Sequence, residues 1–223
     1  MHETPSGTII LPRPAQVDRP ITMGVQKHFT GSIVFGANEG QVMPFESHTE
    51  KLTALVMLAR RSVVDLESQI RFPWVDQNGQ ARTHYFDFRV SHRDGSRVAL
   101  IVKNSKKARE ASFLAEVRCI ASQVTSVFAD RVSLITERHL DPVEVYNAEL
   151  IHCVRIADPE ADAAVKAVIA GINGATKIGD IVTAARISGR GFLAVARMIG
   201  KHEIELVSHE RIGSETLVRR GNN

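Results

Sequence analysis

Three polar residues stand at positions that would suit the hydrolysis of a phosphodiester bond. Glu50 lies in a helical pattern, Asp87 in an alternating segment, and Lys103 at the end of the next apolar segment. Such hydrolysis needs an activated water and a neutralised phosphate, and a cation held by carboxylates supplies most of both. Mg²⁺ prefers oxygen ligands and keeps several waters, so few protein ligands are needed. We expect Glu50 and Asp87 to be metal ligands for Mg²⁺ or Mn²⁺, and Lys103 to position the attacking water.

A predicted helix positions Glu50. Ser47 is a typical N-cap residue, and Glu50 follows it by three residues, which is the spacing of a capping box. Apolar residues after Glu50 recur on one helical face, among them Leu52 and Leu55. Glu50 therefore has a purely structural interpretation as a capping glutamate, and this interpretation is compatible with a catalytic one.

Three predicted strands position the other two residues. They cover residues 68–75, 83–90 and 97–103, and polar turns rich in Asp and Gly separate them. A helix over 108–124 and a short strand over 132–135 follow. The pattern predicts an α/β domain with a mixed sheet.

Strand alternation sets the direction of the side chains. In the second strand Phe86, Phe88 and Val90 share one face and Asp87 lies on the other. In the third strand Ile101 and Lys103 share a face. Pairing of the two strands can bring Asp87 onto the face of Lys103.

This layout resembles the metal-dependent nucleases of the PD-(D/E)xK type. The segments SHTE (47–50), FDF (86–88) and IVK (101–103) are similar to the N-terminal domain of TnsA, a transposon-end endonuclease. The resemblance implies a restriction-endonuclease-like fold, a divalent metal, and catalytic roles for Glu50, Asp87 and Lys103. A glycine-rich hairpin over 31–45, before the helix, also fits it.

Ile101 departs from the family pattern, which has Glu, Asp or Gln two residues before the lysine. Its side chain cannot hold a metal or a water. Either Glu46 or Glu110 supplies the missing carboxylate, or the domain has lost catalysis and keeps its fold for binding DNA. His84 lies near Asp87 in sequence, but alternation places it on the opposite face, where we expect it to pack or to face solvent.

The C-terminal third has a different pattern. Helical patterns cover 161–172, 177–186 and 190–202, and strand patterns cover 203–207 and 216–219. Three helices followed by a β-ribbon predict a winged helix-turn-helix. TnsA-type proteins also carry such a domain at their C-terminus.

The predicted fold class is therefore α/β (α+β), with a restriction-endonuclease-like mixed-sheet domain followed by a winged helix-turn-helix domain. The proline-rich residues 1–30 form an extended, partly disordered arm. Residues 31–140 form the nuclease-like domain, 141–158 a linker or connecting helix, and 159–223 the winged domain.

Basic residues suggest where DNA would bind. The start of the helix after Lys103 is basic, and the third helix and wing of the C-terminal domain carry further cations. An alternative is that these are solvated faces or a protein-docking surface. The candidate nucleic-acid-binding residues are Lys106, Lys107, Arg190, Arg197, Lys201 and Arg211.

Composition narrows the class of protein. The 223 residues are 43% hydrophobic, and the net charge of +3 permits a nucleic-acid partner without requiring one. No apolar stretch approaches the roughly 18 residues of a membrane span, so we expect no membrane partner. Cys119 and Cys153 stand in apolar runs and indicate buried, reduced thiols. We expect a cytoplasmic protein.

Two functions follow from these residues. The first is a TnsA-like, Mg²⁺-dependent DNA endonuclease, weakened in catalysis by Ile101. For this function the resemblance implies a transposase and an ATPase regulator as partners. The second is a non-enzymatic DNA-binding protein that uses a degenerate nuclease fold and a winged helix. A protein-interaction adaptor is a third interpretation. The residues alone leave open whether the chain is an enzyme.

Overall fold

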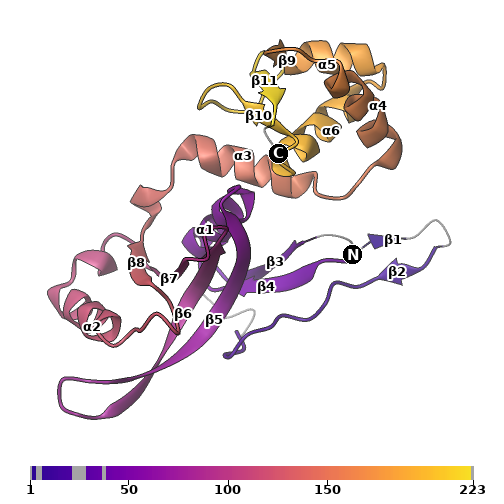
Figure 1. Ribbon diagram of the computed structural model, residues 1–223. Helices are drawn as coiled ribbons and strands as arrows, with labels where there is room; N and C mark the ends of the chain where they lie inside the picture. The colour runs from indigo at the N-terminus through magenta and orange to yellow at the C-terminus, as the bar shows by residue number, and fades with distance from the viewer. Residues whose placement is uncertain (1, 4–6, 22–28, 37–38, 222–223) are drawn as a thin grey trace. The chain divides into compact units, whose positions relative to one another are not determined.

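The computed structural model describes residues 2–3, 7–21, 29–36 and 39–221 (Figure 1). The chain divides into two compact units, Met1–Leu140 and Asp141–Asn223. Each is described by itself below. Together they contain a mixed sheet and six α-helices within the described residues, which confirms a mixed α/β class. None of the helices in these ranges has the length and apolar character that crossing a bilayer requires.

A four-stranded mixed sheet forms the centre of the first unit. Its strands, in spatial order, are β5 (Val63–Val75), β6 (Ala81–His92), β7 (Arg97–Val102) and β8 (Arg131–Ile135). β5, β6 and β7 are antiparallel neighbours, and β8 runs parallel to β7. The predicted strands are therefore present, and β5 and β6 are longer than expected because they pair with each other along almost their whole length.

The turns between these strands follow from local chemistry. The Asp76 carboxylate accepts hydrogen bonds from the backbone N–H groups of Asn78 and Gln80, and Gly79 adopts a φ of 74°. Asp94 and Gly95 make the second turn in the same way. Both turns use residues that tolerate a left-handed backbone or bond to it.

Helices lie on the sheet. α1 (His48–Ala59) contacts β5, β6 and β7, and also the separate hairpin of β3 (Gly31–Phe35) and β4 (Gln41–Phe45). α2 (Ala111–Ala121) follows the short helix η1 (Lys107–Arg109) and contributes Ile120 to an apolar cluster on the sheet. The buried members of that cluster are Phe72, Phe86, Ala99, Ile101, Ile120 and Ala129. The 3₁₀ helix η2 (Glu137–His139) ends the unit.

The described part of the N-terminal arm is tied to the sheet. β1 (His2–Glu3) pairs with β2 (Ile9–Ile10). Farther along, Arg13 bridges to Gln41 of the β3–β4 hairpin, and the Asp18 N–H donates to the Gln69 carbonyl at 3.2 Å. Residues 7–21 therefore form an extended strap with fixed partners. The arm predicted over residues 1–30 is therefore extended where it is described, and its residues 1, 4–6 and 22–28 lie outside the described residues.

The second unit holds four helices and a small sheet. The helices are α3 (Pro142–Cys153), α4 (Pro159–Ala170), α5 (Ile178–Ala185) and α6 (Gly189–Gly200). The strands β9 (Thr176–Lys177), β10 (Ile204–Leu206) and β11 (Leu217–Arg220) pair antiparallel in the order β10-β11-β9. Aspartates cap α3 and α4, each followed by a proline at the first helical position, where no N–H is needed.

The second unit settles one open alternative and differs from expectation elsewhere. Of the two alternatives for segment 141–158, a linker or a connecting helix, most of the segment is the helix α3. Its Ile151 packs so closely on Gly200 that a side chain at Gly200 would collide with it. The predicted two-stranded ribbon gains β9 as a third strand. A strand of two residues is too short to show a periodic pattern in the sequence, so β9 can be recognised only from its pairing with β11. Cys153 is also exposed rather than buried.

Candidate active site

The structure brings the three predicted catalytic residues of the first unit together. Glu50 lies on α1, Asp87 on β6, and Lys103 directly after β7. The Lys103 Nζ lies 3.7 Å from the Asp87 Oδ2. The charge of Asp87 in turn raises the pKa of Glu50, and the charge of Lys103 lowers it. The three side chains are therefore one electrostatic cluster.

Asp87 stands where β6 separates from β7. The β6–β7 ladder runs from the pair Ser91 and Arg97 to the pair Phe88 and Leu100, whereas β6 goes on pairing with β5 up to Ala81. Figure 1 shows this continuation as the long curved β5–β6 ribbon. The Asp87 Oδ2 accepts a hydrogen bond of 2.7 Å from the Val102 N–H. We call this place the strand fork. Asp87, Val102 and Lys103 form it, and Glu50 of α1 belongs to the same cluster of charges.

The side-chain alternation of β6 breaks at the fork. Phe88 lies opposite Leu100, and residues opposite each other in an antiparallel pair share a face. Phe86 instead packs in the apolar cluster with Ile101, which alternation places on the other face from Leu100. The expectation that Phe86 and Phe88 share a face was therefore wrong. In β5, Gln69 lies between the residues paired with Phe86 and Phe88 and has a φ of 53°.

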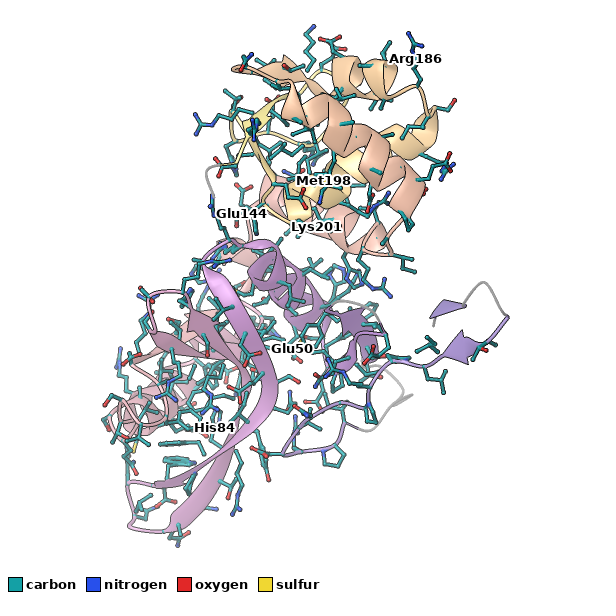
Figure 2. All side chains as sticks on the ribbon, turned by 45° about the vertical axis from the view of Figure 1, so that its right-hand side comes forward. Glu50, His84, Glu144, Arg186, Met198 and Lys201 are labelled. Carbon is teal, nitrogen blue, oxygen red and sulfur yellow. The ribbon has the colours of Figure 1, made fainter. Side chains whose placement is uncertain are left out.

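Glu50 has the structural role at the start of its helix that its position predicts. Its N–H donates to the Ser47 Oγ at 3.1 Å, and the Ser47 Oγ donates to the Glu50 Oε1 at 2.9 Å. The Glu46 N–H donates to the Glu50 Oε2 at 2.8 Å. The side chain caps its own helix while being only 4% exposed. Figure 2 labels it on α1.

Both carboxyl groups hold their protons more tightly than usual. Burial, and then the charge of Asp87, raise the pKa of Glu50 to about 7. Burial also raises the pKa of Asp87, while the Lys103 charge and the Val102 N–H oppose that shift. Because the first effect is desolvation of the charged form, a cation placed between the two groups would offset it. At neutral pH the pair therefore carries less than two negative charges.

The basic residues near Lys103 have different surroundings. Lys103 itself is 40% exposed, and its N–H donates to the Ile135 carbonyl of β8 at 3.0 Å. Lys107 is paired with Glu110 at 2.6 Å and lies over the Phe113 ring. Lys106 is exposed at the start of η1. Of the two predicted phosphate contacts, Lys107 thus already has an acidic partner.

Ile101 lies in the core rather than among the carboxylates. It is fully buried with Phe86 and Ile120 in the apolar cluster on the sheet. A glutamate at this position would bury a charge among apolar side chains, at a large cost in stability. The arrangement of β7 therefore favours an apolar residue here.

Of the two substitutes considered for the missing acid, Glu46 is the nearer one. Its charge raises the pKa of Asp87, and its neighbour in the fold is Arg19. Glu110 is half-exposed and occupied by Lys107. Glu46 thus belongs to the surroundings of the strand fork, and Glu110 belongs to the start of α2.

Arg19 and Gln69 lie near the fork and were not predicted from sequence, and His84, which we expected to pack or to face solvent, lies there too. The His84 ring lies edge-on to Phe86 at 4.7 Å, and its buried Nε2 has no hydrogen-bond partner in the part of the chain that is described. Burial, followed by the charges of Lys103 and Arg19, lowers the pKa of His84 to about 4. Figure 2 labels His84 on β6. The expectation that it packs holds, and the Lys103 and Arg19 charges also act on it.

The donor set fits a divalent ion held by two protein carboxylates. Among the described residues, no group of three or more His, Cys, Asp or Glu side chains is arranged to hold a metal. Glu50 and Asp87 remain as a pair. Mg²⁺ is commonly bound through one or two carboxylates together with waters and substrate phosphate oxygens. The two acids would suit that kind of site and not a closed cage of protein ligands.

Three of the four candidate DNA-contacting cations of the second unit are paired with acids. Arg197 is 5% exposed, and its Nε lies 2.7 Å from the Asp162 Oδ1. The Lys201 Nζ lies 3.5 Å from the Asp162 Oδ2. Arg190 contacts Asp158 at 2.6 Å. These acids stand at the start of α4, so α4 neutralises the charges that we assigned to DNA.

The burial of α6 also differs from that of an open recognition helix. All of residues 194–199 are buried, and α3, α4 and α5 all pack against α6. Arg197, a predicted DNA contact, lies on the buried face of α6, where it pairs with Asp162 of α4. Arg211, between β10 and β11, lies over the Tyr146 ring at 5.0 Å.

No protein-family model matches the chain, and no curated protein matches it either. A functional proposal for this protein therefore rests on its own residues.

Proposed function

We propose that the first unit is a nuclease-type domain of the PD-(D/E)xK kind, similar to TnsA, that hydrolyses DNA phosphodiester bonds with Mg²⁺ or Mn²⁺. One observation carries the proposal. A helix acid, a strand acid and a lysine meet at the fork of β6 and β7, with the Lys103 Nζ 3.7 Å from the Asp87 Oδ2. These are the residue types that this chemistry needs.

Each residue has a role in the proposed reaction. The bound cation would neutralise phosphate charge and lower the pKa of a water. Asp87 and Glu50 are its protein ligands, and the Val102 N–H holds the Asp87 carboxylate in place. Lys103 is exposed enough to reach a phosphate oxygen or the attacking water, where its charge stabilises the transition state. Because the pKa of Glu50 is about 7, the full negative charge of the pair forms above neutral pH.

For the second unit we propose a winged-helix domain. The support is the element order helix, strand, helix, helix, strand, strand from α4 to β11, with β9 pairing to β11 at the edge of the small sheet. The buried, ion-paired α6 argues against base reading by that helix. Arg186 at the end of α5 is an exposed cation of this unit that remains a candidate for phosphate contact.

Two partners are proposed only by resemblance to TnsA-type proteins. They are a transposase and an ATPase regulator. DNA is the partner that the proposed chemistry itself requires.

A second function, non-enzymatic DNA binding, is favoured by Ile101. This residue belongs to the core, so the fork has two carboxylates where the family pattern has three. A site with one ligand fewer would hold Mg²⁺ more weakly. The same fold would then bind DNA without cutting it.

The test is nicking of supercoiled plasmid in Mg²⁺ and in Mn²⁺. Asp87→Asn keeps an oxygen for the Val102 N–H and removes the charge, so it should fold and lose on the order of 100-fold or more of the rate. Lys103→Met should show a similar loss. Glu110→Gln is the matched control, because this acid is paired on the surface, and it should keep the wild-type rate.

The outcomes separate the two functions. Cleavage that persists in Asp87→Asn would place the activity elsewhere or in a contaminant. A folded wild type that binds duplex DNA in a salt-dependent way and never nicks it would support the binding function.

A further inference from the structure

The N-terminal strap (residues 7–21) is anchored to β5 next to the strand fork. The Asp18 N–H donates to the Gln69 carbonyl, and the Arg71 N–H donates to the Asp18 Oδ2 at 2.8 Å. These two bonds join residues more than 50 positions apart in the chain. They set the direction in which the next residue, Arg19, points.

Gln69 forms the receptor for the strap. It is 1% exposed and has a φ of 53°, which costs a non-glycine residue about 1 kcal/mol or more. Gln69 lies between the β5 residues that pair with Phe86 and Phe88, and is therefore opposite Asp87. Its backbone carbonyl and its side-chain oxygen are both used by the strap, the first by Asp18 and the second by Arg19.

Arg19 is held in one orientation. Its Nε and Nη2 donate to the Gln69 Oε1 at 3.0 and 2.7 Å, and Nη2 also contacts the Glu46 carboxylate. The guanidinium lies 5.6 Å from the centre of the Tyr85 ring. The side chain is still 39% exposed, so part of the guanidinium faces solvent.

Arg19 lies beside the strand fork, because it binds the side chain of Gln69, which is opposite Asp87, and its guanidinium lies near the ring of Tyr85, two residues before Asp87. Burial raises the pKa of Asp87, and the positive charge of Arg19 opposes that shift. Burial lowers the pKa of His84, and the charge of Arg19 lowers it further. Lys103 acts on the same two groups. Two cations from distant parts of the chain therefore act on Asp87: Arg19 from the strap and Lys103 from the end of β7.

We propose that Arg19 is a phosphate-binding residue of the strand fork, contacting the DNA backbone beside the phosphate that Lys103 approaches. The inference rests on the proposed function, in either its cleaving or its binding form. A guanidinium matches phosphate geometry with paired N–H donors, and Gln69 and Glu46 hold it ready. Glu46 competes with the phosphate for Arg19, so DNA must displace or share that contact.

The test is the affinity of the full chain for a fluorescent 20-base-pair duplex, in Ca²⁺, between 50 and 200 mM salt. Losing one phosphate contact lowers the slope of log K against log salt by about 0.9. Arg19→Met should show this change and bind roughly 10-fold more weakly, since one charged contact is lost. Arg19→Lys should keep the slope and lose part of the affinity. Arg13→Met is the matched control, because Arg13 is on the same strap and pairs with Glu39. Its affinity should stay within about two-fold of wild type.

A second variant covers the case in which Arg19→Met does not fold. Glu46→Gln removes the competing charge and leaves Arg19 in place, so it should tighten DNA binding several-fold. Unchanged or weaker binding by this variant would overturn the proposal. An unchanged salt slope in folded Arg19→Met would also overturn it while the proposed function stands. A wild-type chain without affinity for duplex DNA would overturn both the role of Arg19 and the proposed function.

Discussion

At the residue scale, the fork combines structural and chemical roles in the same side chains. Glu50 accepts hydrogen bonds from the Ser47 hydroxyl and the Glu46 N–H at the start of α1, and Asp87 accepts one from a backbone N–H where the β6–β7 ladder stops. Each of these hydrogen bonds would stabilise the fold even in a protein without catalytic activity. What goes beyond structure is the placing of two buried acids so close that the charge of Asp87 raises the pKa of Glu50, because that arrangement opposes folding unless a cation or proton is present.

This conflict predicts a pH dependence of stability. The carboxyl of Glu50 has an ordinary pKa of 4.5 in the unfolded chain and about 7 in the folded one. Between these values the folded state binds more protons, so the free energy of unfolding falls as pH rises from about 4.5 to 7. The total fall is on the order of 2 to 3 kcal/mol.

Urea denaturation at pH 5, 6, 7 and 8 measures this effect. Glu50→Gln should have a flatter pH dependence than wild type, whatever its absolute stability. It is not expected to be flat, because the raised pKa of Asp87 acts in the same direction. Glu110→Gln should leave the wild-type curve unchanged. Parallel curves for wild type and Glu50→Gln would show that Glu50 titrates normally.

At the element scale, cations of the second unit form ion pairs that join its helices. Arg197 of α6 and Asp162 of α4 form a buried pair, whereas Arg190 and Asp158 are a more exposed one. Removing one partner of a buried pair leaves an uncompensated charge, but exposed pairs contribute little. The two arginines of one helix therefore differ in what their loss should do.

We predict that Arg197→Met destabilises the second unit by about 3 to 5 kcal/mol, and Arg190→Met by less than about 1 kcal/mol. Hydrogen exchange of the α6 amides measures the change in this unit alone. Adding Asp162→Asn to Arg197→Met should recover part of the loss, since it removes a carboxylate that is mostly buried and keeps only the more distant Lys201 as a partner. Equal effects of the two single substitutions would contradict the assignment. Weak DNA binding by Arg197→Met would report unfolding and not a lost contact.

At the scale of the whole molecule, each unit has its own core and its own set of polar contacts. Every residue assigned to the fork, from Arg19 to Lys103, belongs to the first unit. The second unit has a separate core around Val195, Met198 and Val218. The chemistry proposed for the fork therefore needs no residue of the second unit.

Fragments 1–140 and 141–223 should each unfold cooperatively when expressed alone. The division leaves Asp141 with the second fragment, where it caps α3. Fragment 1–140 should keep whatever nicking or duplex affinity the full chain has at the fork, apart from contacts made by the second unit. Circular dichroism melts and the plasmid assay check this. A non-cooperative melt of fragment 1–140 would show that the unit depends on the rest of the chain.

Local signals in the sequence were enough to predict much of this protein. The cap at Ser47, the Asp and Gly turns of the sheet, and the apolar periods of α4 to α6 act within a few residues, so they survive without knowledge of the fold. They also placed Glu50 in the first turn of a helix, Asp87 within a strand and Lys103 at the end of the next strand. The helix and strand patterns therefore predicted the α/β class.

Tertiary structure decided the features that depend on distant partners. The alternation of β6 breaks because β7 leaves it at Asp87, and no pattern within β6 records where a neighbouring strand ends. Arg19 reaches Gln69 across 50 positions, and Arg197 reaches Asp162 across 35. Charged side chains read from sequence as solvated, but pairing with a distant opposite charge allows them to be buried. For that reason local patterns in the sequence predicted most of the elements and singled out Glu50, Asp87 and Lys103, whereas the fold brought Arg19 beside the fork and buried Arg197 against Asp162.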